Sequence, residues 1–347
     1  MAATLAQVAA LAGVSTQTVS NTISNPSVVK DTTLTRVKAA IDELGYTPNM
    51  RARMLRQQRS GNIGLRIRPT DDNVAGVLID RLLHELSAQA AAYDKHVLLL
   101  SAATDEEEVQ TIEKLAAQSL VDEFVLTDTH PDDHRIEDLS AQNLRFVAFG
   151  RPWGSEDTAP HSWVDVDGRG GTAEATLALI ELGFRRIGFF GWPEGSATGD
   201  DRRGGWAGVV TTELGYTDAD LQALNAESED HISSAIDAAP ALLTAGADAV
   251  VCASDSLAVG MVAAIRTSGA TVPIVGFDNT PLAASFGFSS VDQDLARVAQ
   301  RILAALATPD ETHRGLIPTR LIIRHDPRWG FPTAPHRATA RNRKDVP

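Results

Sequence analysis

From residue 62 onward the chain alternates short apolar runs with longer amphipathic stretches, and this alternation limits the fold more than any other feature. A buried parallel strand is a short apolar run, and the stretch after it supplies the helix that crosses back to the next strand. The runs are Ile63–Ile67, Val97–Leu100, Phe124–Leu126, Phe146–Phe149, Ile187–Phe190, Ala249–Cys252, Ile274–Phe277 and Leu321–Ile323. The pattern predicts a parallel α/β architecture. Because residues 62–332 carry two series of such units, we expect two similar lobes rather than one sheet.

Residues 1–46 have helical spacing instead. Thr4 and Gln7 form a capping box for a first helix that ends at Gly13. Ser15 can cap a second helix, and the Asn25-Pro26 pair stops it. A third helix is indicated by apolar residues on one face, at Leu34, Val37, Ile41 and Leu44. Three short helices with a tight turn between the first two predict a helix-turn-helix module.

Charge divides the chain at the same place. The formal net charge is −14, which alone argues against nucleic acid as a partner. Residues 1–60, however, hold seven basic and three acidic residues and carry +4, which leaves −18 for the rest. A basic module on an acidic body is expected when one end of a protein binds a polyanion.

Composition removes several classes of protein. Hydrophobic residues make up 43% and charged residues 22%, as in an ordinary soluble globular protein. No apolar run is long enough to span a membrane, and the first residues lack the features of a signal peptide, so we expect a cytoplasmic protein. Cys252 is the single cysteine and lies in an apolar run, where a buried, inert thiol is expected.

Three motifs resemble chemical sites and are set aside. The run from Gly168 to Gly171 suggests a dinucleotide loop, but Ala173 stands where the motif needs glycine. The His130–His134 loop offers metal-ligand side chains, yet adjacent loop residues rarely surround an ion, and a solvated loop is favoured. Asp105–Glu108 fit the start of a helix, where acidic side chains interact favourably with the positive end of the helix dipole. We therefore expect no metal, no cofactor and no catalytic residues.

The stretch TLAQVAALAGVSTQTVSNTISNPSVVKDTTLTRVKAAIDELGYTPNMRARMLR resembles the headpiece of the lactose/galactose repressor (LacI/GalR) family. Further family markers follow in order: VDVDGRGGTAEATLALIELGFRRIGFF, Arg202 with Gly205-Trp206, ASDSLAVG and PIVGFDNTPLA. The resemblance covers about residues 4–330. It implies an all-α helix-turn-helix headpiece plus an α/β two-lobed periplasmic-binding-protein-like effector domain.

The resemblance also implies a domain layout. A DNA-binding headpiece is expected over 1–46, a hinge helix and linker over 47–60, and an effector-binding and dimerisation domain over 61–332. Lobe 1 should comprise about 61–160 and 289–319, and lobe 2 about 161–288 and 320–332, with chain crossings near Pro160, Ser289 and Arg320. Residues 333–347 lack periodicity and are expected to be a disordered tail.

In that family the second helix enters the major groove, and its base-reading positions fall here on Thr16, Gln17 and Asn21. Gln and Asn suit adenine edges. The alternative is that these polar residues are merely solvated. The positions that hold phosphates are matched by Ser15, Thr18, Ser20 and Asn25. In the hinge, Leu55 matches a leucine that inserts into a base step from the minor groove. The alternative is that Leu55 is a core leucine. Arg53, two residues earlier, is expected to contact phosphates.

Effector contacts are carried over in the same way. Arg202 and Asp278 match ligand-holding positions, and a guanidinium with a carboxylate suits adjacent sugar hydroxyls. Ser254 and Asp255 follow a strand, although Asp255 could instead cap the next helix. Trp163 aligns with an aromatic that flanks the ligand in some members, but could equally be packing. Arg68 at the end of the first strand hints at a carboxylated or phosphorylated effector, unless a surface Asp pairs with it.

The sequence therefore predicts a homodimeric, sequence-specific transcriptional regulator, a repressor that binds palindromic double-stranded operator DNA and responds to a sugar or sugar derivative. It should be cytoplasmic and nucleoid-associated, with no membrane partner. The alternative is a cytoplasmic solute-binding or sensor protein without operator function. An NAD-dependent enzyme is disfavoured because the glycine motif fails.

Overall fold

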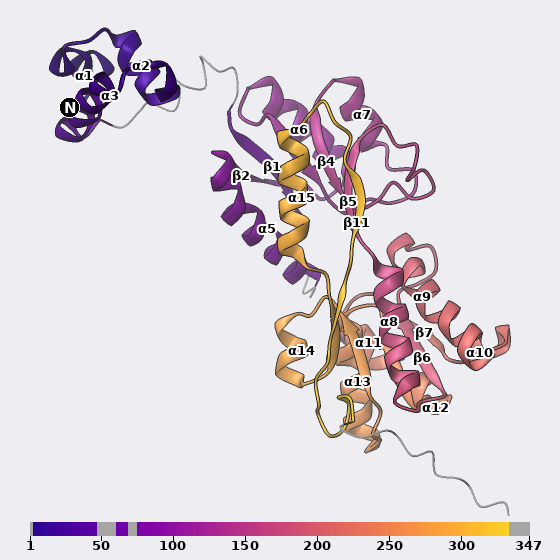
Figure 1. Cartoon of the computed structure of the whole chain (residues 1–347). Helices are drawn as coiled ribbons and strands as arrows, with labels where there is room; N and C mark the ends of the chain where they lie inside the picture. Colours follow the sequence, from indigo (N-terminus) through magenta and orange to yellow (C-terminus); the bar gives the residue numbers. More distant parts are fainter. Residues whose placement is uncertain (1–2, 47–59, 69–74, 333–347) are drawn as a thin grey trace, which may run out of the picture. The chain divides into compact units, whose positions relative to one another are not determined.

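The computed structural model describes residues 3–46, 60–68 and 75–332. The chain separates into two compact units, Met1–Ser60 and Gly61–Pro347, and each is described by itself (Figure 1). The expected hinge and the expected disordered tail fall almost wholly outside the described residues.

The first unit is helical, as predicted. It contains α1 (Leu5–Ala12), α2 (Thr16–Ser24), the 3₁₀ turn η1 (Pro26–Val28) and α3 (Asp31–Leu44). The capping box is present, since Thr4 accepts a hydrogen bond from the Gln7 amide and Gln7 accepts one from the Thr4 amide. Gly13 ends α1 in the left-handed region that favours glycine. A small apolar core unites the three α-helices, with Val8, Val19 and Val37 fully buried in it.

The second unit contains two six-stranded sheets, which confirms the two-lobed α/β fold. The first sheet has the order β11-β5-β4-β3-β1-β2 and the second β12-β10-β9-β8-β6-β7. The first comprises β1 (Asn62–Ile67), β2 (His96–Ser101), β3 (Glu123–Leu126), β4 (Arg145–Phe149), β5 (Ser162–Val166) and β11 (Arg314–Ile317). The second comprises β6 (Ile187–Gly191), β7 (Asn225–Glu227), β8 (Ala249–Cys252), β9 (Ile274–Phe277), β10 (Ser289–Asp292) and β12 (Arg320–Ile322). All described strand pairs are parallel except β10 with β12.

Helices cover both faces of each sheet. In the first lobe α5 (Ala75–Ala90) and α15 (Leu295–Ala307) lie side by side over one face (Figure 1). The opposite face carries α6 (Asp105–Ala117) and α7 (Arg135–Ala141). The short turn η2 (Ala91–Tyr93) follows α5. The helices of the second lobe are α8 (Gly168–Glu181), α9 (Ala197–Leu214), α10 (Asp218–Ala223), α11 (Ile232–Ala238), α12 (Pro240–Thr244), α13 (Asp255–Ser268) and α14 (Pro281–Phe286).

The chain crosses between the lobes at slightly different places than expected. The first crossing follows β5 rather than Pro160, because Ser162–Val166 pair with β4 and β11 in the first sheet. The second follows β10 rather than Ser289, because Ser289–Asp292 pair with β9 and β12 in the second sheet. The third lies between β11 and β12, close to Arg320. Backbone pairing thus assigns 162–166 to lobe 1 and 289–292 to lobe 2.

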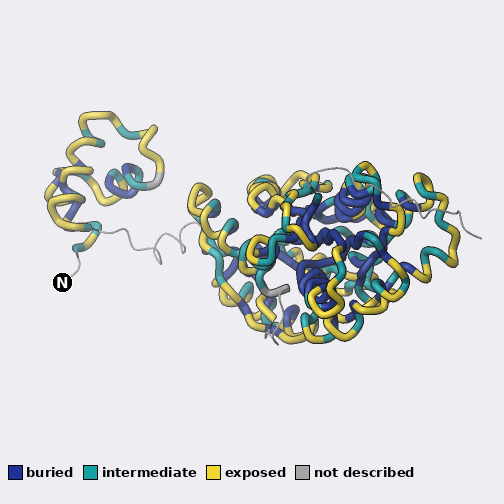
Figure 2. Tube along the Cα trace, turned by 90° about the horizontal axis from the view of Figure 1, so that it is seen from below, coloured by how far each residue is buried: buried dark blue, intermediate teal, exposed yellow. Residues whose placement is uncertain are grey.

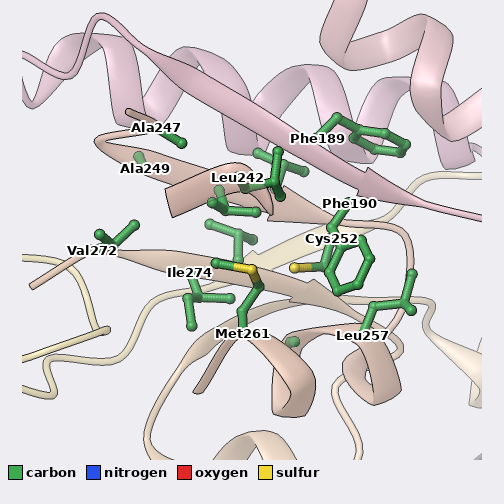
Figure 3. Close-up of a cluster of buried hydrophobic side chains, with 14 of the residues drawn as sticks. Phe189, Phe190, Leu242, Ala247, Ala249, Cys252, Leu257, Met261, Val272 and Ile274 are labelled. Atoms are coloured by element: carbon green, nitrogen blue, oxygen red, sulfur yellow. The ribbon is translucent and has the colours of Figure 1, made fainter. Parts of the chain in front are cut away.

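Buried residues follow the strands and inner helix faces, and exposed residues form the outer surface (Figure 2). The core of the second lobe packs the strand residues of β6, β8 and β9 against α13 (Figure 3). Cys252 is fully buried beside Phe190, and burial raises the pKa of its thiol. The thiol is therefore a small apolar filler, as its sequence context indicates.

Candidate functional site

The outward face of α2 carries the polar side chains that the sequence singled out. Val19 is fully buried in the helical core, which fixes the rotation of α2 about its axis. Thr16 and Gln17 are consequently exposed, and Asn21 is half-buried one turn further along. The amide Nε2 of Gln17 donates to Oδ1 of Asn21 at 2.9 Å. The two amides are thus held together on a face that has the polar groups needed to read base edges.

The expected phosphate contacts differ in how far they are exposed. Ser15 caps α2, since its hydroxyl accepts from the Thr18 amide and pairs with the Thr18 hydroxyl at 2.9 Å. Asn25 ends α2 and is exposed. Ser20 is only 5% exposed, so the structure places its side chain inside the helical unit rather than on the surface. Arg53 and Leu55 lie outside the described residues.

At the facing edges of the two lobes, Arg202 and Asp278 lie together. Arg202 comes from the first turns of α9 and is 4% exposed, and Asp278 directly follows β9. The Arg202 Nη1 lies 3.7 Å from the Asp278 Oδ1 and donates to the Ala253 carbonyl at 2.5 Å. The guanidinium stacks over the Phe277 ring at 3.7 Å and lies 5.2 Å from the Trp192 ring centre. The family resemblance named both Arg202 and Asp278 as expected effector contacts, and the fold brings the two side chains together.

Asp278 is held in an uncommon backbone conformation. Its φ is 96° and that of Asn279 is 48°, both in the range that favours glycine. The Gln293 amide Nε2 donates to the Asp278 Oδ1 at 2.5 Å. Burial raises the pKa of Asp278, and the Arg202 guanidinium opposes that rise. Sequence reasoning missed Gln293, because the strand that precedes it, β10, is polar and was not recognised from the sequence.

The edge of the second lobe also presents groups without partners. The Nε1 of Trp192 and the Nε of Arg202 are buried and have no hydrogen-bond partner among the described residues. Trp192 directly follows β6 and therefore lies at the carboxyl end of that strand. Ligands of open α/β sheets bind at these ends. An indole N–H and a guanidinium N–H are thus available to a bound molecule at this edge.

Ser254 and Asp255 are tied into the second lobe instead. Ser254 caps α13 and donates to the Asp230 carboxylate at 2.5 Å. Asp255 is 0% exposed and accepts hydrogen bonds from the backbone and hydroxyl of Thr280 and from the Ser290 hydroxyl. The expectation that Asp255 touches the effector is not supported, because all these bonds join α13 to β10 and the turn after β9.

Two further expected effector contacts lie elsewhere. Trp163 is 6% exposed and packs in the core under α6 and α7, and its indole donates to the Glu156 carbonyl at 3.4 Å. The packing alternative therefore describes Trp163. Arg68 follows β1, but it is about half exposed and pairs with Asp128 at 3.2 Å. The surface-pair alternative therefore describes Arg68.

Two arginines of the first lobe reach the second lobe. Arg81 on α5 donates to the carbonyls of Asp278 and Asn279 at 2.7 and 3.2 Å. Arg151, after β4, donates to Asp165 at 2.7 Å and reaches Asp201 on α9 at 3.4 Å. Both guanidiniums therefore join the lobes, and Arg81 holds the very turn that carries Asp278.

A separate cluster of charged side chains, most of them buried, joins β1, α6 and the start of α7. Its members are Arg66, Asp105, Glu108, His130, Asp133 and Arg135. Burial opposes ionisation of Asp105, but hydrogen bonds from Arg66 and His130 hold the pKa of this carboxyl well below its usual range. Within the described part of the chain, Asp105, His130 and Asp133 are the one group whose ligand atoms lie within 4.8 Å of one another. Arg66 and Arg135 already pair with these carboxylates, so ion pairing accounts for the cluster.

Comparisons with known proteins agree with this architecture. Residues 4–49 match the description "Bacterial regulatory proteins, lacI family", and residues 176–325 match a periplasmic binding protein-like domain. The regulator AglR of Rhizobium meliloti (strain 1021) is 30% identical over 342 residues, covering 93% of this chain and 94% of AglR. The regulator CelR of Thermobifida fusca is 30% identical over 342 residues, covering 92% of this chain and 97% of CelR.

Solved structures resemble the chain over the same extent. A CelR–cellobiose complex has a TM-score of 0.67 and 27% identity, covering 93% of this chain and 99% of that one. A lac repressor dimer bound to operator and the anti-inducer ONPF has a TM-score of 0.74 at 23% identity, covering 93% and 98%, and shows the shared fold. Among the described residues, no helix is both long and apolar enough to cross a membrane.

Proposed function

Because the chain belongs to the lacI family of bacterial regulatory proteins, it is a DNA-binding transcriptional regulator and not an enzyme. We propose that it represses its target genes and that a sugar bound between its lobes controls this repression. The observation that carries the proposal is the Arg202–Asp278 pair at the facing edges of the lobes. Both groups are buried and held in place, Arg202 by the Ala253 carbonyl and Asp278 by Gln293. A fixed guanidinium and carboxylate can together bind adjacent hydroxyls.

Operator binding is assigned to α2. Its outward side chains Thr16, Gln17 and Asn21 have the polar groups that read bases, and Ser15, Thr18 and Asn25 are accessible for phosphates. The net charge of +4 on residues 1–60 supports contact with a polyanion, but one headpiece offers few phosphate contacts. We therefore propose a homodimer on a palindromic site, with 1–46 as headpiece and 47–60 as hinge. Arg53 is assigned to phosphates and Leu55 to the minor groove. The protein then acts in the cytoplasm, associated with the nucleoid.

The effector is assigned to the sugars. The family relative CelR has been solved with cellobiose, which makes an oligosaccharide a natural first candidate for this chain. The Trp192 ring beside Arg202 can pack against the apolar face of a sugar ring, and its unpaired Nε1 can donate to a hydroxyl. A bound sugar would thus contact an aromatic ring from Trp192, a guanidinium from Arg202 and a carboxylate from Asp278.

The test uses the purified full-length protein and a fluorescent duplex from its own promoter region that contains an imperfect palindrome. Anisotropy should show salt-dependent binding at two protomers per duplex, and a panel of mono- and disaccharides should change the affinity. In R202A and D278A the operator affinity should persist and the sugar response should disappear, because a buried charged partner is worth tenfold or more, about 1.5–3 kcal/mol. Sugar binding without any sequence-specific DNA binding would instead establish the sensor alternative.

A further inference from the structure

A hollow in the first lobe lies away from Arg202 and Asp278. It has a volume of about 580 Å³ and lies between α7 and the segment that joins β4 to β5. Its lining residues include Thr129, His134, Glu137, Trp153, Ser155 and His161. Its size falls in the range of small-molecule sites, which are commonly ~300–1,000 Å³.

Two side chains in its wall have buried polar atoms that the protein does not satisfy. His161 is 9% exposed, and neither Nδ1 nor Nε2 has a hydrogen-bond partner among the described residues. The same holds for the Nε1 of Trp153. Buried polar groups are nearly always hydrogen-bonded, so three unpaired nitrogens in one wall indicate a site for a hydrogen-bonding molecule.

The charges of the wall decide what kind of molecule fits. Among the described lining residues none is Lys or Arg, whereas Asp132, Asp133 and Glu137 are acidic. An anionic group such as a phosphate is therefore disfavoured. Burial and the nearby Arg314 lower the pKa of His161, so its imidazole is neutral and offers one N–H donor and one acceptor. Asp133 is already paired with Arg135, so ligand hydroxyl groups would donate to Glu137 and accept from the two ring N–H groups.

We propose that this cavity is a second ligand site, which binds an uncharged polyhydroxylated molecule of mono- or disaccharide size through Trp153, His161 and Glu137. The site is separate from the Arg202–Asp278 pair and does not require operator binding.

The second site is also mechanically linked to the contact between the lobes. The guanidinium of Arg151 lies 4.5 Å above the Trp153 ring, and the same guanidinium reaches Asp201 of the second lobe at 3.4 Å. A molecule that packs on Trp153 therefore acts on the residue that supports the interlobe ion pair. Binding at this site should alter the sugar affinity of the Arg202–Asp278 site, because two sites that bias one contact are thermodynamically coupled.

The experiment measures sugar binding to the full-length protein without DNA, by saturation-transfer NMR and titration calorimetry. The probes are glucose, maltose and cellobiose, with glucose 6-phosphate as the charged comparison. The background is R202A, which disables the first site. We expect at least one uncharged sugar to bind R202A saturably, with glucose 6-phosphate binding less well. Adding W153F or H161F should weaken this binding about fivefold or more, since each removes hydrogen-bonding groups but keeps an aromatic ring.

W192F is the matched control, because it also deletes an unpaired indole N–H, but at the other site. In an otherwise wild-type protein, W192F should weaken the Arg202–Asp278 site and spare the second one, and W153F should spare operator binding. Circular dichroism and the operator affinity of each variant report whether it is folded. The proposal is overturned if folded R202A binds none of the sugars saturably, or if W153F and H161F leave that binding unchanged. Neither result would affect the proposed repressor function, which rests on the operator assay.

Discussion

The buried carboxyl of Asp255 should make the stability of the second lobe depend on pH in a direction opposite to most carboxyls. Burial, and after it the nearby Asp278, raise the pKa of Asp255 from an ordinary 3.8 to about 7, against the hydrogen bonds from Ser290 and Thr280 that lower it. Gly276 permits this close packing, because a Cβ there would lie 2.2 Å from the Asp255 Oδ1. The carboxyl therefore keeps its proton in the folded state at pH values where the unfolded chain has lost it.

The magnitude follows from that difference. The folded pKa exceeds the unfolded one by about three units, and each unit corresponds to about 1.4 kcal/mol, so the total is on the order of 4 kcal/mol. Because the folded pKa is the higher one, the stabilisation is fully present below pH 3.8 and is lost as the pH rises to about 7. Replacing the carboxyl by an amide removes this dependence. The amide oxygen of D255N can still accept from Thr280, and its nitrogen can donate to the Ser290 hydroxyl.

The assay is urea unfolding of wild type and D255N between pH 4 and pH 8, followed by circular dichroism. As the pH rises, the free energy of unfolding of D255N should increase relative to that of wild type, by up to about 4 kcal/mol. D292N is the control without a pH trend, because its difference from wild type should stay nearly constant between pH 4 and pH 8. Burial raises the pKa of Asp292, but hydrogen bonds from Asn279 and the Asp294 amide outweigh burial and lower it, so this carboxylate stabilises above its unfolded pKa. A difference between D255N and wild type that stays constant over this range would refute the reasoning.

Three other changes test separate parts of the molecule. Gln17→Ala should relax the base preference at one operator position by about 1–3 kcal/mol per half-site, measured by competition among single-base operator variants; equal weakening on all sequences would make Gln17 a phosphate contact. Arg81→Met removes two bonds to the turn that carries Asp278 and should lower sugar affinity about fivefold in calorimetry, with operator affinity in the absence of sugar unchanged. Gly205→Ala places a Cβ 2.1 Å from the Arg169 carbonyl and should cost about 1–3 kcal/mol in unfolding, whereas Gly208→Ala on the same helix meets nothing and should be neutral or stabilising.

The helical unit could be predicted closely because its signals are local. A capping box, a serine cap and two glycines in the left-handed region specify the helix ends without reference to distant residues. The apolar runs likewise located the strands at the centre of each sheet. The apolar runs did not include β5, β7, β10 or β11. The polar strand β10 was missed because Ser289 and Ser290 are buried but hydrogen-bonded to Arg324 and Asp255. A rule that searches for apolar runs cannot find a strand whose buried side chains are satisfied by partners far along the chain.

The same limit applies to single site residues. Arg202 and Asp278 lie 76 positions apart in the sequence, and only the fold shows that they meet. Trp163 is aromatic and near a crossing between the lobes, yet the alternation of side chains along β5 turns it into the core under α6 and α7. Asp255 follows a strand like a ligand-binding residue, but its partners Thr280 and Ser290 come from segments that could not be paired with it from sequence.

The arginines at the facing edges of the lobes also limit the charge of the effector. Arg202 lies beside Asp278, Arg151 pairs with Asp165 and Asp201, and Arg81 pairs with Asp292. A phosphate or carboxylate on the ligand would have to displace one of these carboxylates and leave it without its partner in a poorly solvated place, which is costly. The hydroxyl groups of a ligand can instead lie beside these ion pairs and form hydrogen bonds with the donors and acceptors that the pairs leave unused. The charge balance of the site thus favours a neutral sugar over a phosphorylated or carboxylated one, and it makes Arg68 unnecessary for binding, in agreement with its pairing to Asp128.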